Sequence, residues 1–325
     1  MTSTPTTAYI GARIFDGERW HADSALCVAD GRVVGIGMAA EASEIVRLDG
    51  GELVPGFIDL QVNGGGGHLI GGGTTADDLA AVCAIHARFG ATSILPTLIT
   101  DTSEVTDAVL SAGAEAARRD TPGFLGLHLE GPHLSVARKG AHDPRRIRPM
   151  EESDLVRYEN ARQHLPHLLL TVAAETVTPE QIARLTAAGI VVSIGHSDAS
   201  YEVAAAAFSA GARMATHLFN AMSQIGNRNP GVVGAALDNP AVASGLVADG
   251  IHVHPATARI ALAATGNGPR LFLVSDSMSQ AGTDITQFTL HGDTIYRKNG
   301  ALRLADGTLA GADLTIDRAM FTAQS

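Results

Sequence analysis

Eight short apolar segments alternate with amphipathic, alanine-rich segments from about Gly56 onward, and this alternation limits the possible folds more than any other feature of the sequence. Each apolar segment has the length of a buried strand, and each intervening segment has room for a helix, which is typical of βα units around a parallel sheet. The segments are residues 56–63, 91–99, 124–130, 168–175, 190–197, 213–220, 243–249 and 271–277. Since eight is the strand number of a closed barrel, we predict an α/β fold with a (β/α)8 TIM-like barrel over residues 55–284.

The segments between the apolar runs carry helix start and stop signals. Thr178 is placed to cap a helix, Pro179 suits its first turn, and Gln181 completes a capping box with Thr178. Gly189 then ends that helix before the next strand. A doubly wound open sheet is the structural alternative, but its glycine fingerprint after the first strand is absent from the sequence.

The two flanks of the barrel differ from it. Residues 1–54 and 285–311 carry short strand-like pieces with turn signals such as Asp16-Gly17 and Asn299-Gly300. We predict that these two segments together form one small β-sandwich domain. Residues 312–325 begin as a helix, and we expect them to be the start of a final barrel helix in a chain that is truncated at its C-terminus.

Composition excludes several classes of partner and compartment. The chain has 23 basic and 34 acidic residues, a formal charge of −11, which argues against non-specific binding to nucleic acid or to an anionic membrane. Only Cys27 and Cys83 are present, without the spacing of a thiolate metal site or a disulfide framework. The N-terminus lacks the pattern of a secretory signal, and no segment predicts a membrane span. We therefore expect a cytoplasmic protein.

Polar residues stand at the C-terminal ends of four predicted strands, where the active sites of barrel enzymes lie. Glu130, His196 and His217 form a set of one carboxylate and two imidazoles, the type that holds a catalytic zinc and leaves a fourth position for water. Asp276 ends the eighth strand, beside the first, and is our candidate general base and then general acid. A single histidine at a strand end is more often hydrogen-bonded structure than ligand, and the metal hypothesis depends on the four residues together.

Several motifs make the chain resemble the amidohydrolase superfamily, and within it the family of N-acetylglucosamine-6-phosphate deacetylases. The resemblance runs from about residue 8 to residue 315. It implies metal-dependent hydrolysis of a phosphorylated amino sugar, in amino sugar catabolism. The motifs that carry it are Pro55-Gly56-Phe57-Ile58-Asp59, Leu95-Pro96-Thr97, His128-Leu129-Glu130-Gly131-Pro132, Gly195-His196-Ser197, Thr216-His217-Leu218-Phe219-Asn220-Ala221-Met222 and Asp249-Gly250-Ile251-His252.

The resemblance also bears on the end of the first strand. Most superfamily members carry His-x-His there as ligands of a second metal, whereas this chain carries Gln61 and Asn63. Neutral amides are poor zinc ligands compared with imidazole. The resemblance therefore implies one divalent metal per subunit, zinc or else iron, manganese or cobalt. It also implies that Gln61 lies close to the metal-bound water and belongs to the substrate-binding residues. It further implies that His142 helps to polarise the acetyl carbonyl.

The remaining implied roles concern the sugar and its phosphate. Asn220, Ala221 and His252 match positions that surround the sugar phosphate in the family. Arg228 matches an arginine that reaches the phosphate from the neighbouring subunit, which implies a homodimer. His133 stands where many relatives carry an aromatic residue, which implies that the side of the substrate pocket that faces the sugar differs from that of these relatives.

Two alternatives stay open. Another amidohydrolase activity on the same scaffold, such as that of a cyclic-amide hydrolase or a deaminase, is compatible with the motifs because a fold does not fix a substrate. A non-catalytic or inactive truncated member is the other alternative.

Overall fold

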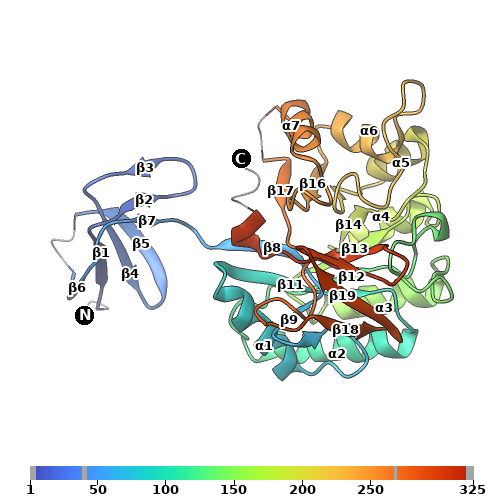
Figure 1. The fold of residues 1–325 in the computed structure, drawn as a ribbon. Coiled ribbons are helices and arrows are strands. Elements are labelled where there is room, and N and C mark those ends of the chain that lie inside the picture. The colour runs from blue at the N-terminus through green and yellow to red at the C-terminus, as the bar shows by residue number, and fades with distance from the viewer. Residues whose placement is uncertain (1–4, 39–41, 267–268, 320–325) are drawn as a thin grey trace. The chain divides into compact units, whose positions relative to one another are not determined.

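The computed structural model describes residues 5–38, 42–266 and 269–319, and the chain divides into two compact units, residues 1–56 and 57–325. The first unit contains two small sheets, with strand orders β5-β4-β1-β6 and β3-β2-β7 (Figure 1). Their strands are β1 (Thr7–Ile10), β2 (Arg13–Phe15), β3 (Trp20–His21), β4 (Ala25–Ala29), β5 (Arg32–Gly37), β6 (Glu44–Arg47) and β7 (Glu52–Leu53).

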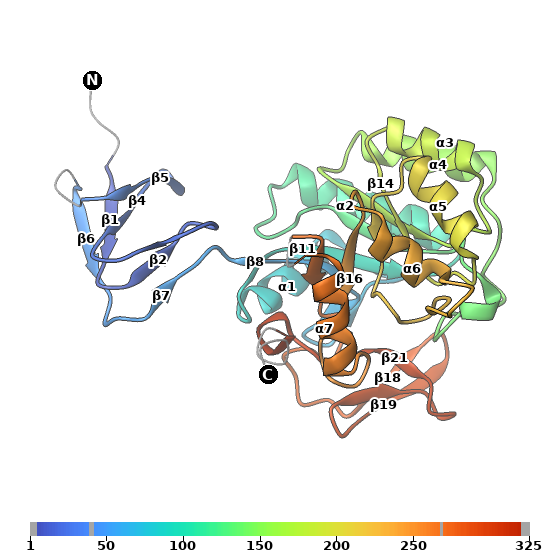
Figure 2. The same ribbon diagram turned by 90° about the horizontal axis from the view of Figure 1, so that it is seen from above.

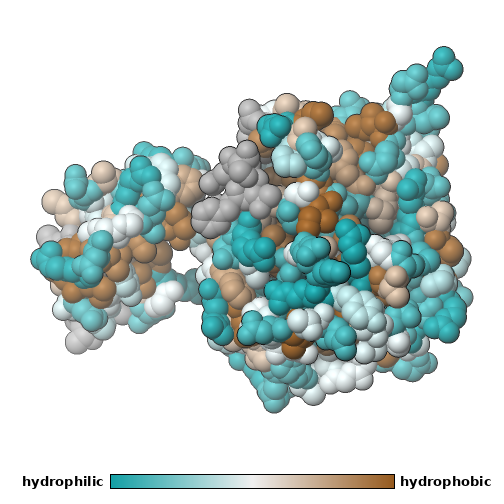
Figure 3. Space-filling model, in the orientation of Figure 1, coloured by the Kyte–Doolittle hydropathy of each residue, from teal (hydrophilic) through white to brown (hydrophobic). Residues whose placement is uncertain are grey.

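Part of the first unit's surface is apolar. Val33 and Val34 on β5 are 62% and 59% exposed, and Ile45 on β6 is also exposed. Brown, hydrophobic residues are visible on this unit in Figure 3. Trp20 is half-covered, because the guanidinium of Arg13 stacks over its ring, 4.1 Å from the ring centre.

Eight parallel strands form the barrel of the second unit, in the order of the sequence, and their positions confirm the predicted segments. They are β8 (Phe57–Val62), β11 (Ala91–Ile99), β12 (Leu127–Glu130), β13 (Leu168–Val172), β14 (Val191–Ile194), β15 (Met214–Ala215), β16 (Ala243–Leu246) and β17 (Leu271–Leu273). The chain beyond β17 joins the last strand to the first: Val62 pairs with Ser277, and Asp276 donates its N–H to the carbonyl of Gln61 at 3.0 Å.

Within the described part of the chain, seven named α-helices follow the strands and lie outside them (Figures 1 and 2). They are α1 (Ala76–Ala87), α2 (Ser103–Arg118), α3 (Glu152–Arg162), α4 (Pro179–Ala187), α5 (Tyr201–Ser209), α6 (Gly231–Asp238) and α7 (Pro255–Ala264). The predicted cap of α4 is confirmed: Thr178 and Gln181 form a reciprocal capping box with Pro179 in the first turn. Among the described residues no helix is long and apolar enough to cross a membrane.

Two further small sheets belong to the second unit. One pairs β9 (Gly64–Gly65) with β10 (His68–Leu69), and the other contains β18 (Gln287–Leu290), β19 (Asp293–Lys298), β20 (Ala301–Arg303) and β21 (Leu309–Ala312). The second sheet packs its apolar side chains against Met278 and Ala141. That residues 285–311 join residues 1–54 in one small β domain stays a prediction. Of residues 312–325, where the start of a final helix was predicted, residues 316–319 are helical, residue 312 ends β21, residues 313–315 are not helical, and residues 320–325 lie outside the described residues.

The ring of His133 lies in the core and is not among the residues that line the large cavity described below, contrary to the role implied on the sugar side. Its Nδ1–H donates to the carbonyl of Arg148 at 3.1 Å, and the hydroxyl of Tyr158 donates to its Nε2 at 3.0 Å. Burial lowers the pKa of His133 to about 4, although the carboxylate of Asp154 acts in the opposite direction.

This buried imidazole makes stability depend on pH. Between pH 6.5 and 4 the unfolded chain takes up a proton at His133 and the folded chain does not, so the free energy of unfolding falls as pH falls, by up to about 1.4 kcal/mol per pH unit. We expect His133→Gln to remove this part of the slope in urea unfolding at pH 7.5 to 5, and the matched Tyr158→Phe variant to retain it. An unchanged slope in His133→Gln would contradict the assignment.

Candidate active site

Four predicted side chains meet at the C-terminal ends of the barrel strands. Glu130 is the last residue of β12, His196 and His217 each lie two residues beyond the ends of β14 and β15, and Asp276 lies three residues beyond β17. All four are buried, with 2–8% of their surface exposed. They line one cavity of about 370 Å³, together with His142.

Three of these residues have the left-handed backbone conformation, which residues other than glycine rarely adopt. The φ angles of His196, His217 and Asp276 are +47°, +32° and +48°. Each such residue costs of order 1–3 kcal/mol and persists only where the surrounding structure imposes it. The left-handed turn after each strand holds these side chains at the cavity.

Three donor atoms converge to the spacing that a metal ion requires. Oε1 of Glu130 lies 3.3 Å from Nε2 of His196 and 3.0 Å from Nε2 of His217, and the two Nε2 atoms are 3.1 Å apart. Ligands about 2.0–2.1 Å from a tetrahedral zinc are separated by about 3.3 Å, so these distances fit such an ion closely.

The hydrogen bonds of His196 set its tautomer. Its Nδ1 lies 2.8 Å from the carbonyl oxygen of Arg138, which can only accept, so Nδ1 carries the proton. The neutral ring then directs the lone pair of Nε2 towards His217 and Glu130, as in metal-bound histidines whose other nitrogen is held by a carbonyl. A cation between these atoms removes the repulsion between lone pairs that face each other.

His142 has the opposite tautomer. Its Nδ1 accepts the N–H of Thr100 at 3.4 Å and lies 2.8 Å from the hydroxyl of that residue, so the proton lies on Nε2, 3.8 Å from Oε2 of Glu130. Burial, followed by the neighbouring His196, lowers the pKa of His142 well below its usual range and keeps it neutral. Glu130, His142 and His196 also lie within 4.8 Å of one another as possible ligands, but a protonated Nε2 suits a hydrogen-bond donor better than a ligand.

The side-chain amides of Gln61 and Asn63, at the end of β8, donate hydrogen bonds to two different carboxylates. Nε2 of Gln61 donates to Oε1 of Glu130 at 3.2 Å, and Nδ2 of Asn63 donates to Oδ1 of Asp276 at 2.7 Å. The expected closeness of Gln61 to the metal site is therefore a contact with the carboxylate of that site. The sequence did not reveal the contact of Asn63 with Asp276, because β8 and the end of β17 are distant in the chain.

The acid at the end of the last strand is set for proton transfer. Burial, followed by the negative charge of Glu130, raises the pKa of Asp276 to about 7, and His217 opposes this rise. A carboxyl group whose pKa lies near neutrality exchanges protons efficiently at physiological pH.

The residues predicted around the sugar phosphate divide into two groups. Asn220, Ala221 and His252 line the cavity, and Nδ1 of His252 lies 2.6 Å from Oδ2 of Asp249, which leaves its Nε2 available. Arg228 is exposed and does not line the cavity of its own chain. Its role in a neighbouring subunit stays a prediction.

Several cavity residues were not predicted from the sequence. Met278, Leu290, Leu309 and Ala310 form an apolar side of the cavity, and the last three come from the segment that we had assigned to a separate β domain. Arg138 also lines the cavity, and the available signal was the Arg138-Lys139 pair that shortly precedes His142.

Comparison with known proteins identifies the family of the chain. The model of the amidohydrolase family matches residues 53–289, which contain the whole barrel. The chain belongs to the amidohydrolase family. Glu130, His142, His196, His217 and Asp276 lie within the matched region.

Two amidohydrolase relatives show how far the similarity extends. One, named N-acetylgalactosamine-6-phosphate deacetylase, from Shewanella sp. (strain ANA-3), is 42% identical over 315 residues, which cover 95% of this chain and 79% of the relative. The other, named N-acetylglucosamine-6-phosphate deacetylase, from Haemophilus influenzae, is 41% identical over 276 residues, which cover 83% of this chain and 71% of the relative.

Solved structures of two deacetylases have the same fold as this chain. The N-acetylglucosamine-6-phosphate deacetylase of Pasteurella multocida superposes with a TM-score of 0.91 at 32% identity, covering 98% of this chain and 87% of that one. A mutant of the Mycobacterium smegmatis enzyme, solved in complex with N-acetyl-D-glucosamine-6-phosphate, gives a TM-score of 0.89 at 32% identity, covering 99% of this chain and 83% of that one.

Because Gln61 and Asn63 donate hydrogen bonds to different carboxylates, a matched pair of variants can test their roles separately. Gln61→Ala removes the hydrogen bond that orients Glu130, and we expect it to weaken divalent metal binding by about 10- to 100-fold. Asn63→Ala removes a bond to Asp276 and is expected to leave metal binding nearly unchanged. Titration of metal-free amidohydrolase with Zn²⁺ measures both, and equal losses would contradict this division.

Proposed function

We propose that this protein hydrolyses the acetamide of N-acetylglucosamine 6-phosphate to glucosamine 6-phosphate and acetate, as a step of amino sugar catabolism. The observation that carries the proposal is the convergence of Glu130, His196 and His217 beside Asp276 and a protonated Nε2 of His142. An ion site, a proton carrier and a hydrogen-bond donor within one cavity are the groups that amide hydrolysis needs. Relatives with this activity in their names support the choice of substrate.

The metal site is assigned to Glu130, His196 and His217. One divalent ion held there supplies Lewis acidity towards the attacking water and the acetyl carbonyl. We propose zinc, because two nitrogen donors and one oxygen donor at tetrahedral spacing suit it, and the same donors also bind iron, manganese or cobalt.

Proton transfer is assigned to Asp276. Its buried carboxylate takes a proton from the attacking water as the carbon–oxygen bond forms, and then gives that proton to the amine nitrogen as the carbon–nitrogen bond breaks. The hydrogen bond from Asn63 fixes one oxygen of this carboxylate, which leaves the other oxygen for the transfer.

Charge stabilisation is assigned to His142. As the carbonyl carbon becomes tetrahedral, negative charge grows on its oxygen, and the Nε2–H of His142 donates to it. The N–H of Thr100 donates to Nδ1, which places the proton on Nε2, so the donor is already oriented before the substrate binds.

Two other functions are separated from this one by substrate. The N-acetylgalactosamine 6-phosphate epimer is the second candidate, because the relative from Shewanella carries that substrate in its name. A cyclic-amide hydrolase or a deaminase is a further candidate, and its substrate needs no phosphate group.

A non-catalytic protein is a separate alternative, but such a protein would not need the buried acids and the oriented hydrogen-bond donor described above.

Turnover and chelation test the proposed reaction together. We expect the zinc-loaded chain to release glucosamine 6-phosphate from N-acetylglucosamine 6-phosphate, and a chelated sample to release none. Asp276→Asn is expected to lower kcat by about 10²- to 10⁴-fold while it still binds metal. Near-normal turnover by Asp276→Asn would refute its role. Faster turnover of the galactosamine epimer or of an unphosphorylated cyclic amide would show that the proposed substrate is wrong.

We further propose that the protein acts as a homodimer in the cytoplasm, with Arg228 reaching the active site of the neighbouring subunit. The exposure of Arg228 on its own chain supports this role, since its guanidinium is free to meet another molecule. Both cysteines, Cys27 and Cys83, are free, as suits a reducing compartment.

The proposed role of Arg228 predicts a selective loss. We expect Arg228→Ala to lower kcat/KM for the phosphorylated sugar by about 10- to 100-fold more than for N-acetylglucosamine, because a charge-assisted contact to phosphate is lost. Kinetics on both sugars, with sedimentation to measure the oligomeric state, check this. Equal effects on the two sugars, or a monomer with full activity, would contradict it.

A further inference from the structure

The cavity contains one cationic side chain that the proposed mechanism leaves unused. Of the described residues that line it, Arg138 is the only lysine or arginine. The acids of the cavity, Glu130 and Asp276, and a formal chain charge of −11 disfavour an anionic ligand. A phosphate group that enters this cavity therefore needs a local positive charge.

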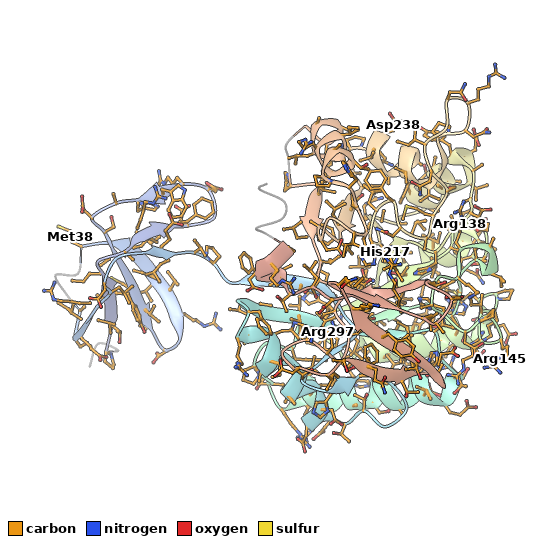
Figure 4. All side chains as sticks on the ribbon, in the orientation of Figure 1. Met38, Arg138, Arg145, His217, Asp238 and Arg297 are labelled. Carbon is orange, nitrogen blue, oxygen red and sulfur yellow. The ribbon has the colours of Figure 1, made fainter. Side chains whose placement is uncertain are left out.

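The guanidinium of Arg138 is held through its Nε, whereas its two Nη atoms have no partner among the described residues. Its Nε donates to Oδ1 of Asp198 at 2.7 Å, and neither of its Nη atoms has a hydrogen-bond partner among the described residues. The side chain is 38% exposed. The main-chain carbonyl of the same residue accepts from Nδ1–H of His196, which places the backbone of Arg138 beside the proposed metal site. Arg138 and His217 are labelled in Figure 4.

Ala221 lines the same cavity as Arg138. Asp198 directly follows Ser197, which pairs with Met222, the residue after Ala221. Ala221 has a φ of +50°, and its N–H has no acceptor among the described residues. An unpaired N–H in a left-handed turn and an oriented guanidinium are both groups that bind phosphate oxygens, and here their residues line one cavity.

We propose that Arg138 is a specificity-determining residue, whose two Nη groups bind the phosphate group of the substrate from within the same chain. This inference rests on the proposed function, since it names a residue that selects the phosphorylated form of that substrate. The planar fork of the guanidinium matches two phosphate oxygens, and Asp198 orients the fork before the substrate arrives.

The test compares Arg138→Gln with a matched change at the next residue. Lys139 has the same charge, but it does not line the cavity, and its Nζ donates to the carbonyl of Gly140. For Arg138→Gln we expect kcat/KM to fall about 10- to 100-fold more for N-acetylglucosamine 6-phosphate than for N-acetylglucosamine, mainly through KM. Lys139→Gln is expected to leave the ratio between the two sugars unchanged. Equal losses on both sugars for Arg138→Gln would overturn the inference.

A binding measurement separates failure of this inference from failure of the proposed function. Calorimetric titration of the zinc-loaded protein with inorganic phosphate is expected to show binding that Arg138→Gln weakens about 10-fold or more and Lys139→Gln leaves intact. If wild-type protein binds phosphate through Arg138 but does not hydrolyse the sugar phosphate, only the proposed reaction fails. If Arg138→Gln binds phosphate as well as wild type, the assignment of Arg138 is wrong whatever the reaction.

Discussion

The burial of the Glu130 carboxylate at the end of β12 is the constraint on which the rest of the site depends. Burial alone raises the pKa of this group, but the neighbouring His196 and His217 outweigh that effect and lower it, so the carboxylate is charged. A buried charge without partners is strongly destabilising, and the groups around Glu130 are two imidazoles and the amide of Gln61, which donates a hydrogen bond to it. The carboxylate and the two imidazoles also form the proposed ion site, where a cation would neutralise the carboxylate, so the requirement for stability and the requirement for catalysis favour the same arrangement.

This geometry is imposed through the backbone. His196, His217 and Asp276 reach the cavity from left-handed conformations at the ends of three strands, and the hydrogen-bonded sheet supplies the free energy that holds them there. Loop contacts complete the arrangement, because the carbonyl of Arg138 and the N–H of Thr100 give His196 and His142 opposite tautomers. Two histidines with rings 4.4 Å apart can thus take different roles, one as a lone-pair donor to a cation and one as a proton donor to an oxygen.

The sequence predicted the barrel and its four rim residues for one reason: the carboxyl ends of parallel strands meet at the same rim, so strand order alone brings Glu130 and Asp276 together. The tautomers, the contact between Asn63 and Asp276, and the cavity position of Leu309 depend on contacts between distant segments, which no local pattern encodes. His133 illustrates the same limit. The resemblance implied that His133 changes the wall on the sugar side, but the ring turns into the core, where Tyr158 and a carbonyl satisfy both of its nitrogens.

The two amides after the first strand follow from the need to orient two acids without adding charge. An imidazole at position 61 or 63 would offer a lone pair to a second cation, or a further positive charge when protonated, and either would lower the pKa of the neighbouring Asp276. An amide instead donates a neutral N–H: Gln61 to Glu130 and Asn63 to Asp276. Asp276 can then keep a pKa of about 7 while Glu130 stays ionised, and the two carboxylates of one cavity serve different purposes because their environments differ.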